Sequence, residues 1–184
     1  MYIAMVSAEC APAAKAGGLG DFVQGLAREL AARGHELEVF LPRYDCLRFE
    51  SIADLHKVYE GLQVPFYGDW IRCVVECGWS EGIRCLFVDP QSPEGFFRRG
   101  AIYGEPDDAD RFAFFSRAVL EVMHRSGRHP DIIHCNDWHT GLVPLYVKLL
   151  SSWERLFEHT KTVLTIHNIG YQGVFGAEVV HDLG

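Results

Sequence analysis

Three short polar segments carry residue types suited to binding a phosphorylated or polyhydroxylated ligand. The first runs from Lys15 to Asp21 as Lys-Ala-Gly-Gly-Leu-Gly-Asp. Its glycines would let the backbone approach a phosphate, a following helix would direct free N–H groups at the anion, and the lysine would add positive charge. The alternative is an ordinary glycine turn that closes onto a helix, with Asp21 as the N-cap. The residue pattern alone leaves both interpretations open.

The surroundings of this segment disfavour a dinucleotide site. The segment is neither GxGxxG nor the GxxxxGK[ST] of P-loop proteins. A dinucleotide fold would also prefer an acidic residue at the end of the second strand to hold the ribose, whereas residues 41–43 are Leu-Pro-Arg. An interpretation as an NAD-binding domain is therefore weakened.

The second segment runs from His134 to His139 as His-Cys-Asn-Asp-Trp-His. Asp137 follows a strand-like run, where a carboxylate could accept sugar hydroxyls or orient a histidine; alternatively it caps the next helix. Trp138 could stack on a sugar ring, but we favour a core position for it. His134 alternates inward along its strand, which predicts a hydrogen-bonded core residue rather than a ligand.

The third segment runs from His167 to Gln172 as His-Asn-Ile-Gly-Tyr-Gln. A histidine at a strand end, followed by amides, provides several donors and acceptors in fixed directions, which suits a polyol. The alternative is an ordinary strand-to-loop turn in which Asn168 takes a strained conformation. The histidines of these segments match no zinc motif such as HExxH, so we expect no metal.

A scaffold of alternating strands and helices would position these segments. Buried strands are predicted at residues 3–7, 37–41, 131–135 and 162–167. Helices are predicted from near Asp21 to a C-cap at Gly34, over residues 107–126, and over about 138–150, where Pro144 predicts a kink or a late start. Parallel strands place their carboxyl ends at one edge of a sheet, so we expect the three segments to converge there.

Residues 57–88 break this alternation. Three strand-like runs, 57–66, 71–77 and 84–88, are separated by turn signals at Gly68-Asp69 and Glu81-Gly82. They predict an antiparallel meander or hairpin extension of the sheet. The fold class is therefore α/β, a doubly wound, Rossmann-like and mostly parallel sheet in a single domain over 1–184, with no finished element in residues 174–184.

Composition excludes several classes of protein. A formal net charge of −8 argues against a nucleic-acid binder, and the adjacent pair Arg98-Arg99 is expected in a solvated loop. No apolar run reaches the roughly 18–20 residues of a membrane span, and the first residues do not form a signal peptide. None of the six cysteines forms a CxxC, so buried free thiols in a reducing cytoplasm are expected.

Together the three segments resemble motifs of one enzyme family. Residues 7–21, Ser-Ala-Glu-Cys-Ala-Pro-Ala-Ala-Lys-Ala-Gly-Gly-Leu-Gly-Asp, resemble the lysine–glycine–glycine signature of bacterial glycogen synthases and plant starch synthases. Residues 134–141 and 165–173 are similar to two further motifs of that family, in the same order and at similar spacing. Tyr103-Gly104 and the run 110–112 also look like that family. The resemblance spans essentially all 184 residues.

The resemblance implies the N-terminal, acceptor-side lobe of a two-lobed GT-B glycosyltransferase. Such enzymes transfer glucose from ADP-glucose or UDP-glucose to the non-reducing end of an α-1,4-glucan, with retention and without a metal or other cofactor. Family members have a second lobe that supplies the nucleotide pocket and is absent from this chain, so we expect the chain alone to be inactive. No residue here is a convincing covalent nucleophile, which favours front-face transfer assisted by the diphosphate.

The resemblance also implies roles for individual residues. Lys15, Gly17 and Gly18 would contact the donor diphosphate. Asp137 and His167 would be the catalytic residues, with His167 beside the transferred glucose, where it would help to stabilise the cationic transition state. The glucose or the acceptor glucan would be surrounded by Asp21, Tyr103, His139 and Asn168.

Two departures from the family pattern and two competing functions remain. Phe22 replaces the usual small aliphatic residue, which predicts a packing change, and Asp108 stands where relatives often carry Asn. The first competing function is a stand-alone glucan-binding module without catalysis. The second is a dehydrogenase-like nucleotide domain, which predicts NAD binding. The sequence leaves the donor nucleotide and the oligomeric state open.

Overall fold

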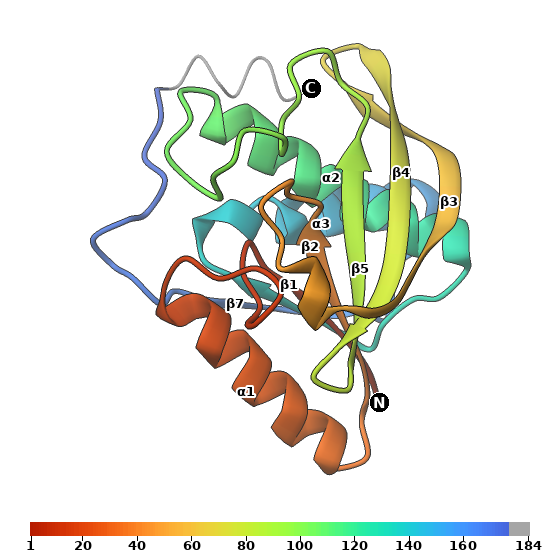
Figure 1. Cartoon of the computed structure of the whole chain (residues 1–184). Helices are drawn as coiled ribbons and strands as arrows, with labels where there is room; N and C mark the ends of the chain where they lie inside the picture. The colour runs from red at the N-terminus through yellow and green to blue at the C-terminus, as the bar shows by residue number, and fades with distance from the viewer. Residues whose placement is uncertain (177–184) are drawn as a thin grey trace.

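The computed structural model describes residues 1–176, without the side chains of residues 150–154. In this range seven strands form one sheet in the order β3-β4-β5-β2-β1-β6-β7 (Figure 1). Their bounds are β1 Tyr2–Val6, β2 Glu36–Pro42, β3 Ala53–Phe66, β4 Asp69–Ser80, β5 Ile83–Pro90, β6 Ile132–Asn136 and β7 Lys161–Thr165. The expectation for the tail falls largely on residues 177–184, outside the described range.

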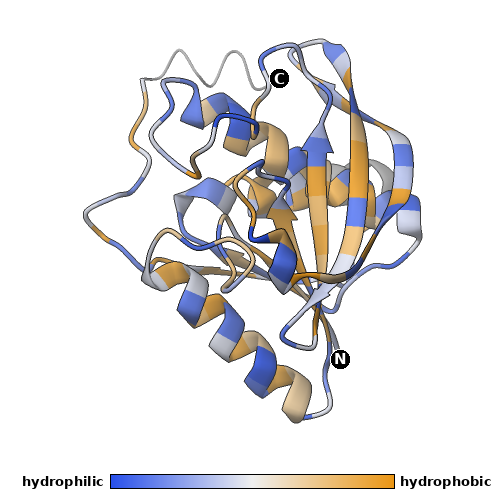
Figure 2. Cartoon of the chain, viewed as in Figure 1, coloured by the Kyte–Doolittle hydropathy of each residue, from blue (hydrophilic) through white to orange (hydrophobic). Residues whose placement is uncertain are grey.

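The five strands from β5 to β7 are parallel, as predicted. β1 and β6 are almost fully buried, because a parallel sheet of this kind is covered on both faces. β7 ends the sheet and differs from them: Val163 and Leu164 are each 46% exposed. Figure 2 shows apolar residues concentrated in the central strands and alternating with polar residues along the helix α1 (Gly18–Ala32).

The predicted meander is present, and its strands are longer than expected. β4 pairs antiparallel with both β3 and β5. The second turn is Glu81-Gly82, with φ of 49° and 76°, as predicted. The first turn is Tyr67-Gly68, with φ of 53° and 74°, one residue before the predicted pair. A type I′ hairpin turn, one of the two types that match the twist of the strands, needs positive φ at both positions, and Asp69 already belongs to β4.

Helices flank the sheet. α2 (Asp108–Ser126) matches its predicted bounds within one residue and ends at Gly127, whose φ of 66° provides the left-handed cap. α3 (Val143–Glu154) starts late because Pro144 fits only the first turn, where its missing N–H is not needed. α1 starts at Gly18, not near Asp21, and its N-cap is Gly17. The interpretation of Asp21 as the N-cap is therefore wrong.

The cysteine thiols are free, and five of them are buried as predicted. Burial raises the pKa of the Cys135 thiol to about 12. The exception is Cys46, which lies exposed in the loop after β2. Among the described residues, no helix is long and apolar enough to cross a membrane.

Candidate active site at the carboxyl edge of the sheet

The glycine-rich segment leaves β1 and returns toward the sheet as the start of α1. Gly20 is the glycine that packing requires, because a Cβ there would lie 3.3 Å from both Ala11 N and Ala14 O. A Cβ on Gly17 would meet nothing nearer than 3.8 Å, and one on Gly18 nothing within 4 Å. The small size of Gly17 and Gly18 is thus unexplained by packing inside the chain, as expected where a ligand approaches the backbone.

Lys15 and Asp21 face one another at the start of α1. Lys15 Nζ lies 2.6 Å from Asp21 Oδ1, and both side chains are exposed. Gly17 differs from the sequence-based picture, because its N–H donates to the Glu9 carboxylate at 2.7 Å. That group is therefore not available to a phosphate. Helix geometry instead leaves the N–H groups of Gly18 and the residues after it without intrahelical acceptors.

Asp137 joins the ends of β6 and β7. Its Oδ1 accepts hydrogen bonds from the backbone N–H of His167 at 2.7 Å and of Asn168 at 3.4 Å. Asp137 occupies the N-cap position of the 3₁₀ helix η2 (Trp138–Thr140), as the alternative interpretation had it, but its side chain makes no capping bond there. Asp137 also has a φ of 59°, an uncommon conformation for a non-glycine residue that is concentrated at functional sites.

The His167 ring is held from two sides. Its Nε2 lies 3.0 Å from Asn136 Oδ1, and the Phe22 ring packs against it with centroids 4.4 Å apart. The Asn136 amide donates to the carbonyls of Val6 and His134, so its oxygen is the atom that faces the histidine. In a neutral ring, Nε2 would therefore carry the proton and Nδ1 would be the acceptor.

The turn at Asn168 is unstrained. Asn168 does not have a positive φ, and its Oδ1 accepts the Gly170 N–H at 3.0 Å in a local turn. The strained alternative is therefore wrong. The prediction for His134 is confirmed, since this residue is buried and its Nε2 lies 2.7 Å from Thr165 Oγ1.

Tyr103 and His139 form a wall in the middle of this edge. The Tyr103 hydroxyl donates to Glu9 Oε1 at 2.7 Å, and its ring lies 4.8 Å from that of His139. Burial and the nearby Arg111 charge lower the pKa of His139 to about 3, so the imidazole is neutral. Its buried Nδ1 has no hydrogen-bond partner within the described part of the chain. Trp138, which we placed in the core, is only partly buried and packs between Phe112 and Phe175.

The three segments converge, as predicted from the parallel sheet. Successive contacts link them from the glycine segment to the end of β7 and back to α1: Gly17, Glu9, Tyr103, His139, Trp138, Asp137, His167 and Phe22. Two cavities flank the wall. Lys15 and Tyr103 line one of about 410 Å³, whereas Asp137 and His139 line a more apolar one of about 430 Å³.

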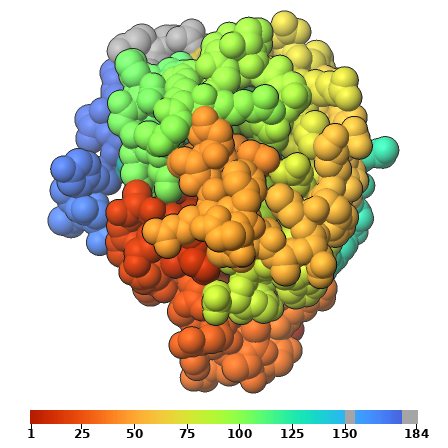
Figure 3. Space-filling model, viewed as in Figure 1, coloured from red at the N-terminus to blue at the C-terminus, as the bar shows by residue number. Residues whose placement is uncertain are grey.

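Neighbouring loops support this edge of the sheet. Figure 3 shows the loop after β2 at the surface between the N-terminal loop and the loop after β5. Arg48 N donates to Ala13 O at 2.9 Å, and Asp45 N donates to Phe97 O at 3.0 Å. These backbone bonds tie the loop after β2 to both of its neighbours.

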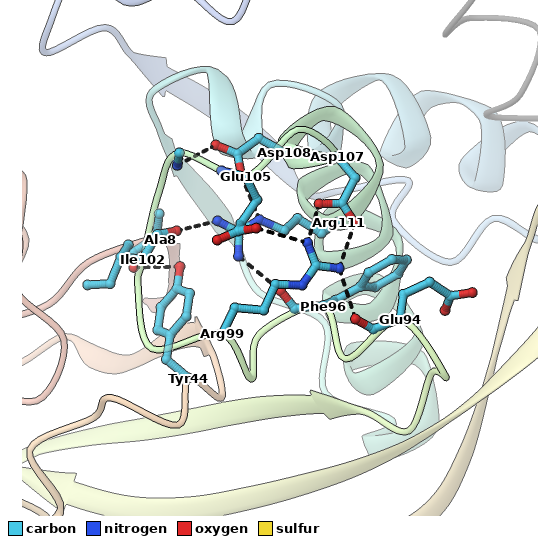
Figure 4. A network of polar contacts seen from close by, with 11 residues as sticks. Ala8, Tyr44, Glu94, Phe96, Arg99, Ile102, Glu105, Asp107, Asp108 and Arg111 are labelled. Atoms are coloured by element: carbon cyan, nitrogen blue, oxygen red, sulfur yellow. Dashed lines mark hydrogen bonds and ion pairs between the residues drawn. The ribbon is translucent and has the colours of Figure 1, made fainter.

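Sequence reasoning included Arg111 in a family-like run but missed its role, which is to hold the loop bearing Tyr103. Arg111 is fully buried and binds Asp108 at 2.7 Å, the carbonyl of Phe96 at 2.9 Å and the carbonyl of Ile102 at 2.6 Å (Figure 4). Asp108 also accepts from the loop backbone at residues 104 and 105, so its departure from the family Asn has a structural role. The signal in the sequence that could have indicated this role was a charged residue beside Phe112 on an apolar face of the helix.

The expectation of a solvated loop at Arg98-Arg99 is wrong in one respect, because both side chains are paired. Arg98 Nη2 lies 2.6 Å from Asp89 Oδ2. Arg99 binds Asp107 and the carbonyl of Glu94 (Figure 4). The Arg99 guanidinium lowers the pKa of Asp107. Within residues 1–176, no three His, Cys, Asp or Glu side chains are grouped so that they could hold a metal ion.

Known proteins are similar to the chain over its whole length. It is 50% identical over 184 residues to "Probable glycogen synthase 2" of Synechocystis and 50% identical over 185 residues to "Glycogen synthase 1" of Nitrosococcus oceani. The catalytic domain of Starch Synthase IV from Arabidopsis thaliana, solved bound to ADP and acarbose, matches with a TM-score of 0.95 and 41% identity. The match covers 100% of this chain, 37% of each of the two bacterial proteins and 37% of the solved chain.

This edge of an α/β sheet, with a lysine at a helix start and a fixed histidine, belongs to a fold that the chain shares with that solved catalytic domain. The family model described as "Starch synthase catalytic domain" matches residues 2–184. The chain belongs to this family.

Proposed function

We propose that the chain is the acceptor-side lobe of a retaining glucosyltransferase that extends α-1,4-glucan from ADP-glucose or UDP-glucose. The observation that carries the proposal is the convergence of the glycine segment, the Tyr103 and His139 wall and the Asp137–His167 corner at one edge of the sheet. The relative solved with ADP and acarbose favours an adenine nucleotide as donor.

The start of α1 suits the leaving diphosphate. Lys15 is exposed there beside the positive end of the helix dipole. As the bond from glucose C1 to the diphosphate breaks, negative charge grows on the phosphate oxygens, and a fixed cation stabilises it. We assign Lys15 and the backbone at Gly18 to this role. Asp21, its present partner, would then be released to accept a sugar hydroxyl.

The Asp137–His167 corner suits the sugar. Asn136 and Phe22 fix the His167 ring, so its Nδ1 lone pair has a defined direction toward a cationic sugar or one of its hydroxyls. Asp137 holds the backbone of this corner through Oδ1. In front-face transfer, the acceptor hydroxyl attacks C1 and gives its proton to a phosphate oxygen. We assign contacts with the glucose or glucan to Tyr103, His139 and Asn168.

A second lobe completes the enzyme in this proposal. The chain spans 37% of the length of the bacterial relatives compared with it. We assign recognition of the nucleotide base to the remaining part, expect the chain by itself to be inactive, and place the enzyme in the cytoplasm without a metal or other cofactor.

The test is transfer of labelled glucose to maltooligosaccharide by the full-length protein that carries this chain. Lys15→Ala is expected to lower kcat by about 100-fold or more, the loss typical of one transition-state contact. Lys57→Ala, which removes an exposed lysine that pairs with Glu60, is the matched control and should keep full activity. Undiminished transfer by Lys15→Ala would refute the role of Lys15. Binding of maltooligosaccharide without any transfer would favour the glucan-binding module instead.

A further inference from the structure

A buried carboxylate lies between the two halves of the proposed site. Glu9 is 2% exposed and follows β1 in the loop that leads to the glycine segment. Its Oε2 accepts the backbone N–H groups of Ala16 and Gly17, each at 2.7 Å. Its Oε1 accepts the Tyr103 hydroxyl, also at 2.7 Å and from 94 residues away in the sequence. One side chain therefore contacts both the glycine segment and the loop that carries Tyr103.

The burial of this charge needs a physical reason. Removing a carboxylate from water is unfavourable unless every oxygen finds donors, and an apolar residue of similar size would often stabilise the fold better. No ion pair within the described residues involves Glu9. Its charge is instead stabilised by two backbone N–H groups at the start of α1, where the helix dipole favours an anion, and by a phenol. Each of these donors belongs to a segment of the proposed site.

The two oxygens bind two different segments of the site. Ala16 and Gly17 lie between Lys15 and Gly18, which we assign to the diphosphate. Tyr103 packs on His139, on the side assigned to the sugar. A shift of either segment would break bonds to the same carboxylate, so the two segments keep one relative position.

We propose that Glu9 is a positioning residue that fixes the glycine segment and Tyr103 relative to one another, so that the diphosphate and the glucan are held in one geometry. The inference rests on the proposed function for its purpose, but the coupling itself is a property of the chain. It predicts that a substitution in one segment weakens the hydrogen bonds of the other segment.

Amide hydrogen exchange on the chain tests the coupling without any need for catalysis. Tyr103→Phe removes one oxygen and keeps the ring that packs on His139. We expect exchange at the Ala16 and Gly17 amides to become about threefold to tenfold faster, although both amides donate to Glu9 and not to Tyr103. Glu9→Gln places an NH₂ group where a carboxylate oxygen accepted hydrogen bonds and should accelerate the same two amides by about tenfold or more.

Glu38→Gln is the matched control, because Glu38 is also a buried glutamate, 4% exposed, but pairs with Arg84 and Arg128. It should leave exchange at Ala16 and Gly17 unchanged relative to the strands. Unchanged exchange of both amides in Tyr103→Phe, or a uniform acceleration throughout the chain, would overturn the proposal and leave Glu9 a structural residue. If Glu9→Gln fails to fold, Tyr103→Phe still decides.

Kinetics of the full-length protein give a second readout. Each single variant should raise the KM for the sugar nucleotide, and the double variant should lose less than the product of the two single losses, because both break the same link. A loss in the double variant equal to the product of the two single losses would contradict a positioning role for Glu9. A loss of stability with an unchanged KM would contradict it as well. If the wild type transfers no glucose, the proposed function fails, while the exchange experiment still decides the role of Glu9.

Discussion

Replacing Arg111 by methionine tests whether the buried network under the Tyr103 loop stabilises the fold. The methionine fills most of the same volume but donates nothing to Asp108 or to the carbonyls of Phe96 and Ile102. Asp108 would lose this partner although its side chain is only 13% exposed. Two carbonyl oxygens would lose donors that come from a completely buried guanidinium.

The expected loss follows from these contacts. Removing one partner of a buried ion pair costs about 3–5 kcal/mol, because the remaining groups stay desolvated. We therefore expect Arg111→Met to lower the free energy of unfolding by about 4 kcal/mol, a large share of the roughly 5–15 kcal/mol of a typical domain. For a chain of this size the midpoint of thermal unfolding should fall by about 8–16 °C.

Urea unfolding, followed by circular dichroism and by fluorescence, measures this difference. Arg99→Met is the internal comparison, since Arg99 belongs to the same network but its side chain is 22% exposed and it pairs with partly exposed acids. It should cost about 1 kcal/mol or less. Similar losses for the two variants would refute the reasoning that burial sets the difference.

Two further predictions concern the pH dependence of stability and the segment after β7. The pKa of His139 is about 3 in the fold and 6.5 otherwise, so only the unfolded chain binds the proton in between. The free energy of unfolding should fall by up to about 1.4 kcal/mol per unit as pH decreases from 6.5, and His139→Gln should reduce this slope; an identical slope would contradict the assignment. Gly173 has a φ of 63°, and a Cβ there would overlap the Trp138 ring. Gly173→Ala should therefore cost about 2–4 kcal/mol and shift tryptophan fluorescence, whereas Gly25→Ala, with open space around it, should be neutral or stabilising; equal stability of the two variants would count against the overlap.

Periodic elements could be predicted from the sequence because local physics determines them. The apolar period of α2, its acidic start and Gly127 define its ends within one residue. Glu81-Gly82 supports the positive φ that a tight hairpin needs. The convergence of the three segments followed from a general property of parallel sheets, whose carboxyl ends share one edge.

Contacts within the loops could not be predicted, because they depend on irregular backbone paths. The partners of Glu9 are two loop N–H groups and a tyrosine 94 residues away, and no periodicity encodes them. Asp137 resembled a helix cap because caps follow strands in the same way; only the path of β7 shows that its carboxylate holds His167. Phe22 was expected to be a packing change, and its partner proves to be His167.

The open margin of the sheet at β7 has a practical consequence. Adjacent residues of a strand point to opposite faces, so the partial exposure of both Val163 and Leu164 means that neither face of this strand is fully covered. Such a margin is a template for the addition of another strand, from any polypeptide that offers one. Concentrated solutions of the chain by itself should therefore be prone to association and precipitation for as long as no other strand covers this edge.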